Sequence, residues 1–262
     1  MKRDSITQID VITPTFHSEK FINLMIRSFE KFKPDNLKIN YIIVENSDDE
    51  SYKEKTLSLC ENITWITNPT HLTNSDANAI GVEVGLKHSS SDYVFISHCD
   101  TFVTSKTFLP SLIKKTQEGN ELVGTVLDPC RIEAVHQSGM LVKSEIAKSV
   151  NLYPVRNHTE MTHDVCDLIT EKCRDNDIKH MCFNNTFNTP SLIDDLSEPF
   201  KSFHVDRCLD ENGEVMFMHL GRGIPKQFNQ YNKPNRVYFP QWVKFCESYL
   251  GENTKVEPHH NQ

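Results

Sequence analysis

Residues 93–101 begin as an apolar run, which is followed by side chains that can bind a metal ion. Residues 93–97 are mostly apolar or aromatic and predict a short buried strand, which is followed by His98, Cys99 and Asp100. On an extended strand His98 and Asp100 project to one face, and Cys99 projects to the other as a buried thiol. An imidazole and a carboxylate at the carboxyl end of an interior strand suit a divalent cation that holds a phosphorylated ligand. Taken alone, the tripeptide also fits a strand end with two unrelated polar residues.

A second candidate ligand lies more than a hundred residues further along the chain. An apolar run from Val215 to Met218 predicts a strand that ends in His219, and Gly221 and Gly223 follow it. Glycines allow backbone N–H groups to come close to phosphate oxygens. A single histidine after an apolar strand is usually a simple strand end, but its combination with His98 and Asp100 favours a role as a ligand.

The elements that must position these side chains follow an alternating pattern in the first half. Apolar alternation predicts strands over residues 8–13, 39–44, 63–67 and 93–97. Helical spacing predicts helices over residues 20–32, 75–86 and 107–115, with Ser75 as a possible N-cap. Strands that alternate with helices in this way indicate an α/β fold with a mostly parallel sheet flanked by helices.

The second half is less regular. Residues 140–142, 178–183 and 214–219 predict strands, and residues 164–173 and 240–250 predict helices. Residues 184–198 show little periodicity and are expected to form a loop.

The net charge and the spacing of the cysteines argue against several classes of function. The 262 residues carry a formal net charge of −8, which argues against nucleic acid or an anionic membrane as the default partner. The eight cysteines contain no CxxC pair, so a zinc knuckle is not expected. We expect no signal peptide, no transmembrane segment and a cytoplasmic location.

Several short motifs in order resemble the glycosyltransferases with the GT-A fold, especially those of family 2, over roughly residues 9–223. They are Val-Ile-Thr-Pro-Thr-Phe from residue 11, Ile-Ile-Val-Glu-Asn-Ser-Asp from residue 42, Ser-Asp-Ala-Asn-Ala-Ile-Gly from residue 75, His98-Cys99-Asp100, and the strand that ends in His219. The resemblance implies a nucleotide-sugar donor, most plausibly a UDP-sugar.

The resemblance also implies which residues contact the donor nucleotide. They are Thr13, Pro14, Thr15, Glu45, Asp76, Asn78, His98, Arg222 and Lys226. Glu45 stands where the family usually has Asp, and Asp76 and Asn78 are equally well explained as polar residues of a first helical turn.

The metal motif of the family is Asp-x-Asp, and His98 replaces its first carboxylate here. The resemblance implies a metal site made by Asp100, His98 and His219. A mixed imidazole and carboxylate site favours Mn²⁺ over Mg²⁺. Alternatively, Asp100 alone holds the metal and His98 forms a hydrogen bond to a ribose or phosphate.

A basic segment with interleaved aromatic residues follows His219. Residues 221–244 contain five Lys or Arg, five aromatic residues and no acidic residue. The resemblance implies a flap that neutralises the diphosphate. A surface for single-stranded nucleic acid and a tail packed on the core are the alternatives.

An inverting transfer needs a carboxylate that accepts a proton from the acceptor hydroxyl. The family places this base at the start of a helix in the second half, which points to Asp164 and then to Asp167. Asp164 as a simple N-cap is the alternative. By analogy, the segment from His136 to Met140 lines the sugar or acceptor pocket.

The combined prediction is one GT-A catalytic domain over residues 1–223, with a nucleotide-binding half (1–105) and an acceptor half (106–223), followed by a flap and helix over residues 224–262. The predicted activity is metal-dependent, inverting transfer of a sugar to a hydroxyl of a glycan, a protein or a small molecule. Alternatives are transfer to a hydroxymethylated DNA base and an inactive relative that binds a nucleotide or glycan. A nucleotidyltransferase is disfavoured because residues 14–18 contain no glycine.

Overall fold

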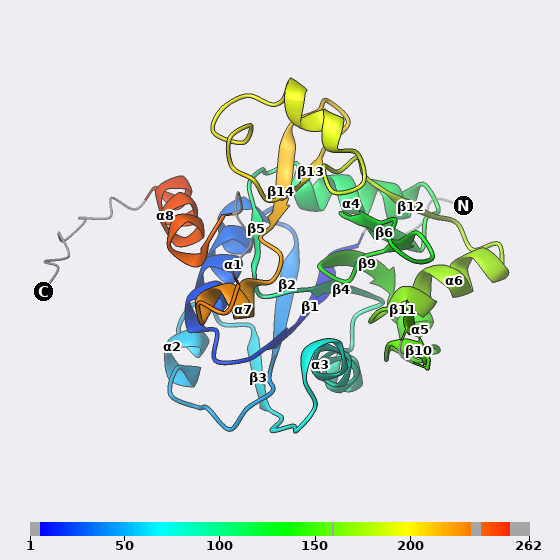
Figure 1. The fold of residues 1–262 in the computed structure, drawn as a ribbon, viewed down its shortest axis with the longest axis horizontal. Coiled ribbons are helices and arrows are strands. Elements are labelled where there is room, and N and C mark those ends of the chain that lie inside the picture. The colour runs from blue at the N-terminus through cyan, green and yellow to red at the C-terminus, as the bar shows by residue number, and fades with distance from the viewer. Residues whose placement is uncertain (1–5, 159, 232–236, 252–262) are drawn as a thin grey trace, which may run out of the picture.

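A seven-stranded sheet forms the centre of the computed structural model, which describes residues 6–158, 160–231 and 237–251 (Figure 1). The strand order is β12-β6-β9-β4-β1-β2-β3. The strands are β1 (Gln8–Thr15), β2 (Lys38–Glu45), β3 (Ile63–Thr67), β4 (Tyr93–Ser97), β6 (Leu122–Gly124), β9 (Gly139–Lys143) and β12 (His180–Cys182). Strands β1 to β4 are mutually parallel, whereas β9 runs antiparallel to both β4 and β6.

Helices cover both faces of this sheet. The helices of the described residues are α1 (Glu19–Phe32), α2 (Lys53–Leu57), α3 (Asn74–His88), α4 (Phe108–Gln117), α5 (Ser144–Ala147), α6 (Asp167–Asp175), α7 (Gly223–Gln227) and α8 (Phe239–Leu250). Apolar residues of α1, α4 and α8 belong to one hydrophobic cluster, and those of α3, α5 and α6 belong to a second cluster.

Alternation along the central strands explains why both faces are covered. Val11 belongs to the cluster under α1, and its neighbour Ile12 belongs to the cluster under α3. Successive side chains of a strand point to opposite faces, so a strand that is apolar at every position must be buried on both sides. The α/β fold with a mostly parallel sheet flanked by helices is therefore confirmed.

Three smaller sheets are added in the second half. β13 (Asp206–Leu209), β14 (Val215–His219) and β5 (Thr101–Val103) form an antiparallel sheet in the order β13-β14-β5. β7 (Leu127–Asp128) pairs with β8 (Ala134–Val135), and β10 (Val155–Asn157) pairs with β11 (Glu160–His163). The chain passes from the central sheet to the β5 sheet directly after β4.

Several local predictions are corrected. Helix α3 begins at Asn74 with Thr73 at its N-cap, so Ser75 is not the cap. Helix α6 begins at Asp167, after Cys166 in a left-handed conformation, so Asp164 lies outside the helix and is not its N-cap. The predicted loop over residues 184–198 contains a 3₁₀ helix, η1 (Pro190–Asp195). The short strands β5 to β8 and β10, β11 and β13 carry too few residues for a periodic pattern to identify them.

The C-terminal helix α8 agrees with the prediction over residues 240–250 and packs on α1. The rings of Phe21 and Phe239 are 5.0 Å apart, Lys20 forms an ion pair with Glu247, and Trp242 is fully buried. Within the described residues, no helix has the length and apolar character needed to cross a membrane.

Candidate functional site

His98, Cys99 and Asp100 lie in a tight turn between β4 and β5 rather than on the strand itself. His98 and Asp100 do lie on the same side, as expected, but the turn brings them together and not the alternation of side chains along a strand. Cys99 is buried in the hydrophobic core, as expected for a structural thiol. Because the turn carries the chain from one sheet to another, it holds both polar side chains at the carboxyl end of β4.

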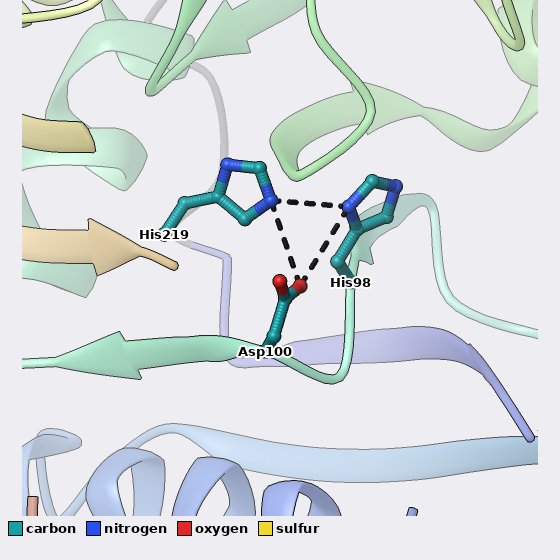
Figure 2. A group of neighbouring side chains, drawn as sticks. All are labelled: His98, Asp100 and His219. Atoms are coloured by element: carbon teal, nitrogen blue, oxygen red, sulfur yellow. Dashed lines mark hydrogen bonds and ion pairs between the residues drawn. The ribbon is translucent and has the colours of Figure 1, made fainter. Parts of the chain in front are cut away.

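His219 joins these two residues because it ends β14, where its backbone pairs with Thr101 of β5. Figure 2 shows the three side chains turned toward one another. His98 Nδ1 lies 3.2 Å from His219 Nε2 and 3.8 Å from Asp100 Oδ1. His219 Nε2 lies 3.5 Å from the same Asp100 oxygen. Two histidines and a carboxylate from distant segments thus point at one another.

The three ligand atoms fit a single metal ion. Each lies within 4.8 Å of the other two. Metal bonds of about 2.0–2.2 Å place neighbouring ligand atoms roughly 3 Å apart, so only a small contraction is needed. Two imidazole nitrogens and one carboxylate oxygen suit a borderline cation such as Mn²⁺ better than Mg²⁺, which prefers oxygen ligands.

Two neighbouring groups hold the ligands in place. The Asp206 carboxylate lies 3.0 Å from Nδ1 of His219. The backbone N–H of Gly223, the first residue of α7, donates a hydrogen bond of 2.9 Å to Oδ2 of Asp100. A Cβ atom at position 223 would lie 2.5 Å from Cβ of Asp100, so glycine is required for this approach.

The electrostatics of the cluster favour a positive charge at its centre. Burial alone would lower the pKa of His219, but the Asp100 and Asp206 carboxylates raise that pKa to about 10. Burial and the charge on His219 lower the pKa of His98 to about 3. Burial would raise the pKa of Asp100, but His219 and other partners hold it well below its usual range. The site thus stabilises one positive charge between carboxylates.

His136 extends the cluster on the side of β9. Its ring centroid lies 5.4 Å from that of His98 and 5.7 Å from that of His219. Its Nδ1 lies 2.9 Å from the hydroxyl oxygen of Ser138. Burial and the charge on His219 lower the pKa of His136 to about 4, so the ring is neutral at pH 7. The segment expected to line the sugar or acceptor side therefore borders the three ligands.

Beyond His136 lies a group of carboxylates around Arg131. The guanidinium is 2.6 Å from Asp128, 3.4 Å from Asp164 and 3.3 Å from Asp167. Asp128 and Asp164 both act electrostatically on His136, which connects this group to the cluster of His98, Asp100 and His219. The sequence did not single out Arg131 or Asp128, because Asp128 ends the two-residue strand β7, Arg131 lies in the connection from β7 to β8, and such short elements carry no periodic pattern.

Asp164 and Asp167 have different surroundings. The Asp167 side chain is 2% exposed, and its Oδ2 accepts a hydrogen bond of 2.7 Å from the backbone N–H of Asp164. Burial raises the pKa of Asp167, against the influence of Arg131. The Asp164 side chain is 20% exposed, and its Oδ1 accepts a hydrogen bond from the backbone N–H of Val165. Asp164 is therefore the more accessible of the two carboxylates.

On the other side of the turn, β1 and β2 bring the expected nucleotide residues together. Thr13, Pro14 and Thr15 end β1, and Thr15 pairs with Glu45 at the end of β2. Glu45 is fully buried, and its carboxylate accepts hydrogen bonds from the backbone of His17, from Ser47 and from the Tyr52 hydroxyl. Both oxygens of Glu45 are thus held by protein groups.

Asp76 and Asn78 lie in the first turn of α3, and both are half-buried. Asp76 forms an ion pair with Arg156 of β10 at 2.6 Å. Asn46, directly after β2, donates a hydrogen bond of 2.7 Å to the Ala77 carbonyl. The start of α3 is thereby fixed to the end of β2.

The basic segment after His219 is only partly near the site. Arg222 is exposed at the N-cap of α7. Lys226 is buried, donates a hydrogen bond of 3.0 Å to the Leu220 carbonyl and lies over the ring of Tyr231. Trp242 is fully buried in the core, so its ring is not available to stack on a base. Lys233 and Arg236 lie outside the described residues.

A sequence model of one family matches more than half of the chain. Its description is "Glycosyl transferase family 2", and it covers residues 10–166. No curated protein matches the chain at a significant level.

Solved structures provide further comparisons of the fold. Glucosyl-3-phosphoglycerate synthase from Mycobacterium tuberculosis, in complex with phosphoglyceric acid, has a TM-score of 0.49 at 16% identity, over 67% of this chain and 69% of that chain. The mannosyltransferase PcManGT from Pyrobaculum calidifontis, in complex with GDP-Man and Mn²⁺, has a TM-score of 0.44 at 15% identity, over 53% of this chain. TarS (residues 1–349) from S. aureus, in complex with UDP, has a TM-score of 0.44 at 18% identity, over 56% of this chain. The chain spans 45% of the mannosyltransferase and 50% of TarS.

Proposed function

The chain belongs to glycosyl transferase family 2, and we propose that it transfers a sugar from a nucleotide-sugar donor to an acceptor hydroxyl, with a divalent metal ion bound by His98, Asp100 and His219. The observation that carries this proposal is the convergence of three ligand atoms, from segments 121 residues apart, at the carboxyl end of β4. Open α/β sheets bind their ligands at this edge.

The bound metal ion, Mn²⁺ rather than Mg²⁺ in this proposal, would neutralise the diphosphate of the leaving nucleotide. The chain itself holds the three ligands in orientation through Asp206 and the backbone of Gly223. Arg222, exposed beside the cluster, supplies a further positive charge for the diphosphate. Lys226 already has partners, so its role there requires a change in its contacts.

For the donor, we propose a UDP-sugar whose nucleoside binds at the ends of β1 and β2, near the start of α3. Thr13, Pro14 and Thr15 contribute the edge of β1. Because the carboxylate of Glu45 is held by three neighbouring residues, we propose that Glu45 shapes this wall and leaves direct polar contacts to Asp76 and Asn78.

We propose Asp164 as the catalytic base of an inverting reaction. Its carboxylate accepts the proton of the acceptor hydroxyl while the acceptor oxygen bonds to the anomeric carbon. The bond between that carbon and the diphosphate oxygen breaks, and the nucleoside diphosphate leaves with the electron pair. Arg131 fixes the position of the Asp164 carboxylate at 3.4 Å. Asp167 supports the backbone of Asp164 instead of reacting.

The proposed division of labour is a nucleotide-binding half over residues 1–105 and an acceptor half over residues 106–223. Within residues 224–262, we propose that only the part around α7 acts as a flap over the diphosphate. Helix α8 packs on α1, and its Trp242 is part of the core. Residues 232–236 and 252–262 of this segment lie outside the described residues.

The experiment that tests the proposal is nucleotide release from a panel of UDP- and GDP-linked sugars, with Mn²⁺ or with EDTA. We expect slow, Mn²⁺-dependent release from one donor, and loss of that release in Asp100→Ala. Undiminished release in Asp100→Ala would contradict the metal site. No release and no metal-dependent nucleotide binding across the panel would instead support an inactive binding protein.

A further inference from the structure

The Asp206 carboxylate is placed to control how His219 presents its nitrogens. Asp206 begins β13 and pairs directly with His219 across the β13–β14 hairpin. Its Oδ2 lies 3.0 Å from Nδ1 of His219, while Nε2 of the same ring faces Asp100 and His98. The ring therefore lies between a carboxylate on one side and the two other metal-binding candidates on the other.

We propose that Asp206 is a positioning residue, which orients His219 and fixes its tautomer for metal binding. This inference rests on the proposed metal site. A histidine binds a metal through an unprotonated nitrogen, and its other nitrogen then carries the proton and needs an acceptor. Asp206 accepts the Nδ1–H, so Nε2 is the nitrogen that gives up its proton to the metal ion, and its lone pair then points to the position between His98 and Asp100.

The contacts of Asp206 distinguish this role from a structural one. Among the described residues, the carboxylate has no hydrogen-bond partner other than His219. The hairpin that carries it is held by backbone pairing of β13 with β14, and Phe217 and Met218 of β14 lie in the core. In the part of the chain that the structure describes, this side chain neither caps a helix nor forms an ion pair with Lys or Arg. Its removal should therefore leave the hairpin folded.

The expected effect follows from the chemistry of second-sphere carboxylates. Loss of such a partner typically weakens metal binding about 10- to 100-fold. Asp206→Ala should weaken Mn²⁺ binding by this factor. Asp206→Asn keeps a side-chain carbonyl that can accept the Nδ1–H, so it should restore most of the affinity. A full Asn rescue would show that the acceptor matters more than the negative charge.

The test is a titration of the folded protein with Mn²⁺ alone, with the free ion measured by electron paramagnetic resonance. Wild type, Asp206→Ala and Asp206→Asn are compared in wild-type and His219→Ala backgrounds. If Asp206 acts through His219, Asp206→Ala should have no further effect once His219 is Ala. An equal loss in both backgrounds would overturn the positioning role, and so would an unchanged affinity in Asp206→Ala.

Asp210→Asn is the matched control, since Asp210 lies at the other end of the same hairpin. Its Oδ1 accepts hydrogen bonds from the backbone of Asn212 and Glu214. We expect a lower melting temperature with unchanged Mn²⁺ affinity, which separates general destabilisation from a specific loss of metal.

Asp100→Ala separates the two proposals. If Asp100→Ala abolishes Mn²⁺ binding and Asp206→Ala does not change it, only the role of Asp206 fails. If the wild type does not bind Mn²⁺, or if Asp100→Ala binds it as the wild type does, the metal site itself fails, and the inference about Asp206 with it.

Discussion

The two halves of the molecule contribute to the same site through different kinds of structure. Strands β1 to β4 are parallel and lie side by side, and β1, β2 and β4 are largely buried between helices on both faces. From residue 101 onward, all the strands of the described residues have two to five residues, and they belong to four different sheets. The first half is a continuous scaffold, whereas the second half is an assembly of short pieces.

The halves also differ in how they hold polar side chains. In the first half, the Glu45 carboxylate accepts hydrogen bonds from His17, Ser47 and Tyr52, which belong to the same half. In the second half, Arg131 and Asp164 come from separate connections, and His219 reaches His98 only through the pairing of β14 with β5. Substitutions within β1, β2 and α3 should therefore change stability, whereas substitutions at the cluster of His98, Asp100 and His219 or in the second half should change metal binding or transfer.

The largest effect is expected for Asp164→Asn. An amide cannot accept the acceptor proton, so transfer should fall about 10²- to 10⁴-fold, while binding of the donor nucleotide is retained. The measurement is sugar transfer at saturating donor, alongside a nucleotide titration.

Asp167→Asn is its control, because Asp167 holds the backbone of Asp164 through a hydrogen bond. It should lower the melting temperature and reduce transfer less than Asp164→Asn does. Wild-type transfer by Asp164→Asn would remove this residue from the role of base.

Gly223→Ala tests whether α7 supports the metal ligands. The added Cβ would lie 2.5 Å from Cβ and 2.7 Å from Oδ2 of Asp100, so the carboxylate must move. We expect Mn²⁺ affinity to fall about 10-fold or more, because ligand orientation is lost. Ile224→Ala, which removes atoms from the same helix, should leave the affinity near that of wild type. Similar affinities in all three proteins would show that Gly223 does not position Asp100.

Gly85→Ala tests the first half. A Cβ at this position of α3 would lie 2.3 Å from Cγ2 of Ile12 on β1, with no room between helix and sheet. Overpacking of this kind costs about 1–3 kcal/mol in the free energy of unfolding. Chemical denaturation should detect this loss, with Mn²⁺ affinity unchanged.

The same clash predicts a non-additive pair. Ile12→Ala removes Cγ2, so Gly85→Ala should cost less in that background than in the wild type. If Gly85→Ala lowered the free energy of unfolding equally in both backgrounds, the strain would not lie in the contact between α3 and β1.

Asp10→Asn should have the smallest effect, and the effect should depend on pH. Asp10 accepts hydrogen bonds from Asn40 and from the backbone N–H groups of Ser90 and Ser91. Burial would raise the pKa of Asp10, but these hydrogen bonds lower it overall. Because Asn keeps one acceptor oxygen, Asp10→Asn should lower the free energy of unfolding by only about 1 kcal/mol.

A lowered pKa gives the sign of the pH dependence. The stabilisation by Asp10 is complete above the pKa of an unfolded Asp and is lost as the pH falls through the lower, folded value. The stability difference between wild type and Asp10→Asn should therefore shrink in acid. A difference that is constant from neutral pH to acid would contradict the role of the charged carboxylate.

The sequence by itself determined the scaffold and the types of chemistry. Apolar strands that alternate with helices indicate a mostly parallel sheet covered on both faces, because this arrangement buries the side chains of both faces of each strand. The residues that end β4 and β14 identified His98, Asp100 and His219 as candidates, since polar side chains directly after a buried strand stand out against the apolar pattern.

Only the tertiary structure decided which of these residues meet and what surrounds them. The contact between His98 and His219 joins positions 121 residues apart, and it exists because β14 pairs with β5 after the chain has left the central sheet. The positions of Arg131 and Asp206 depend on strands of two to four residues, which are too short to leave a periodic signal. The geometry of the site thus depends on the pairing of short strands that are far apart in the sequence. The contacts that stabilise this pairing join distant segments, so no local stretch of sequence reveals them.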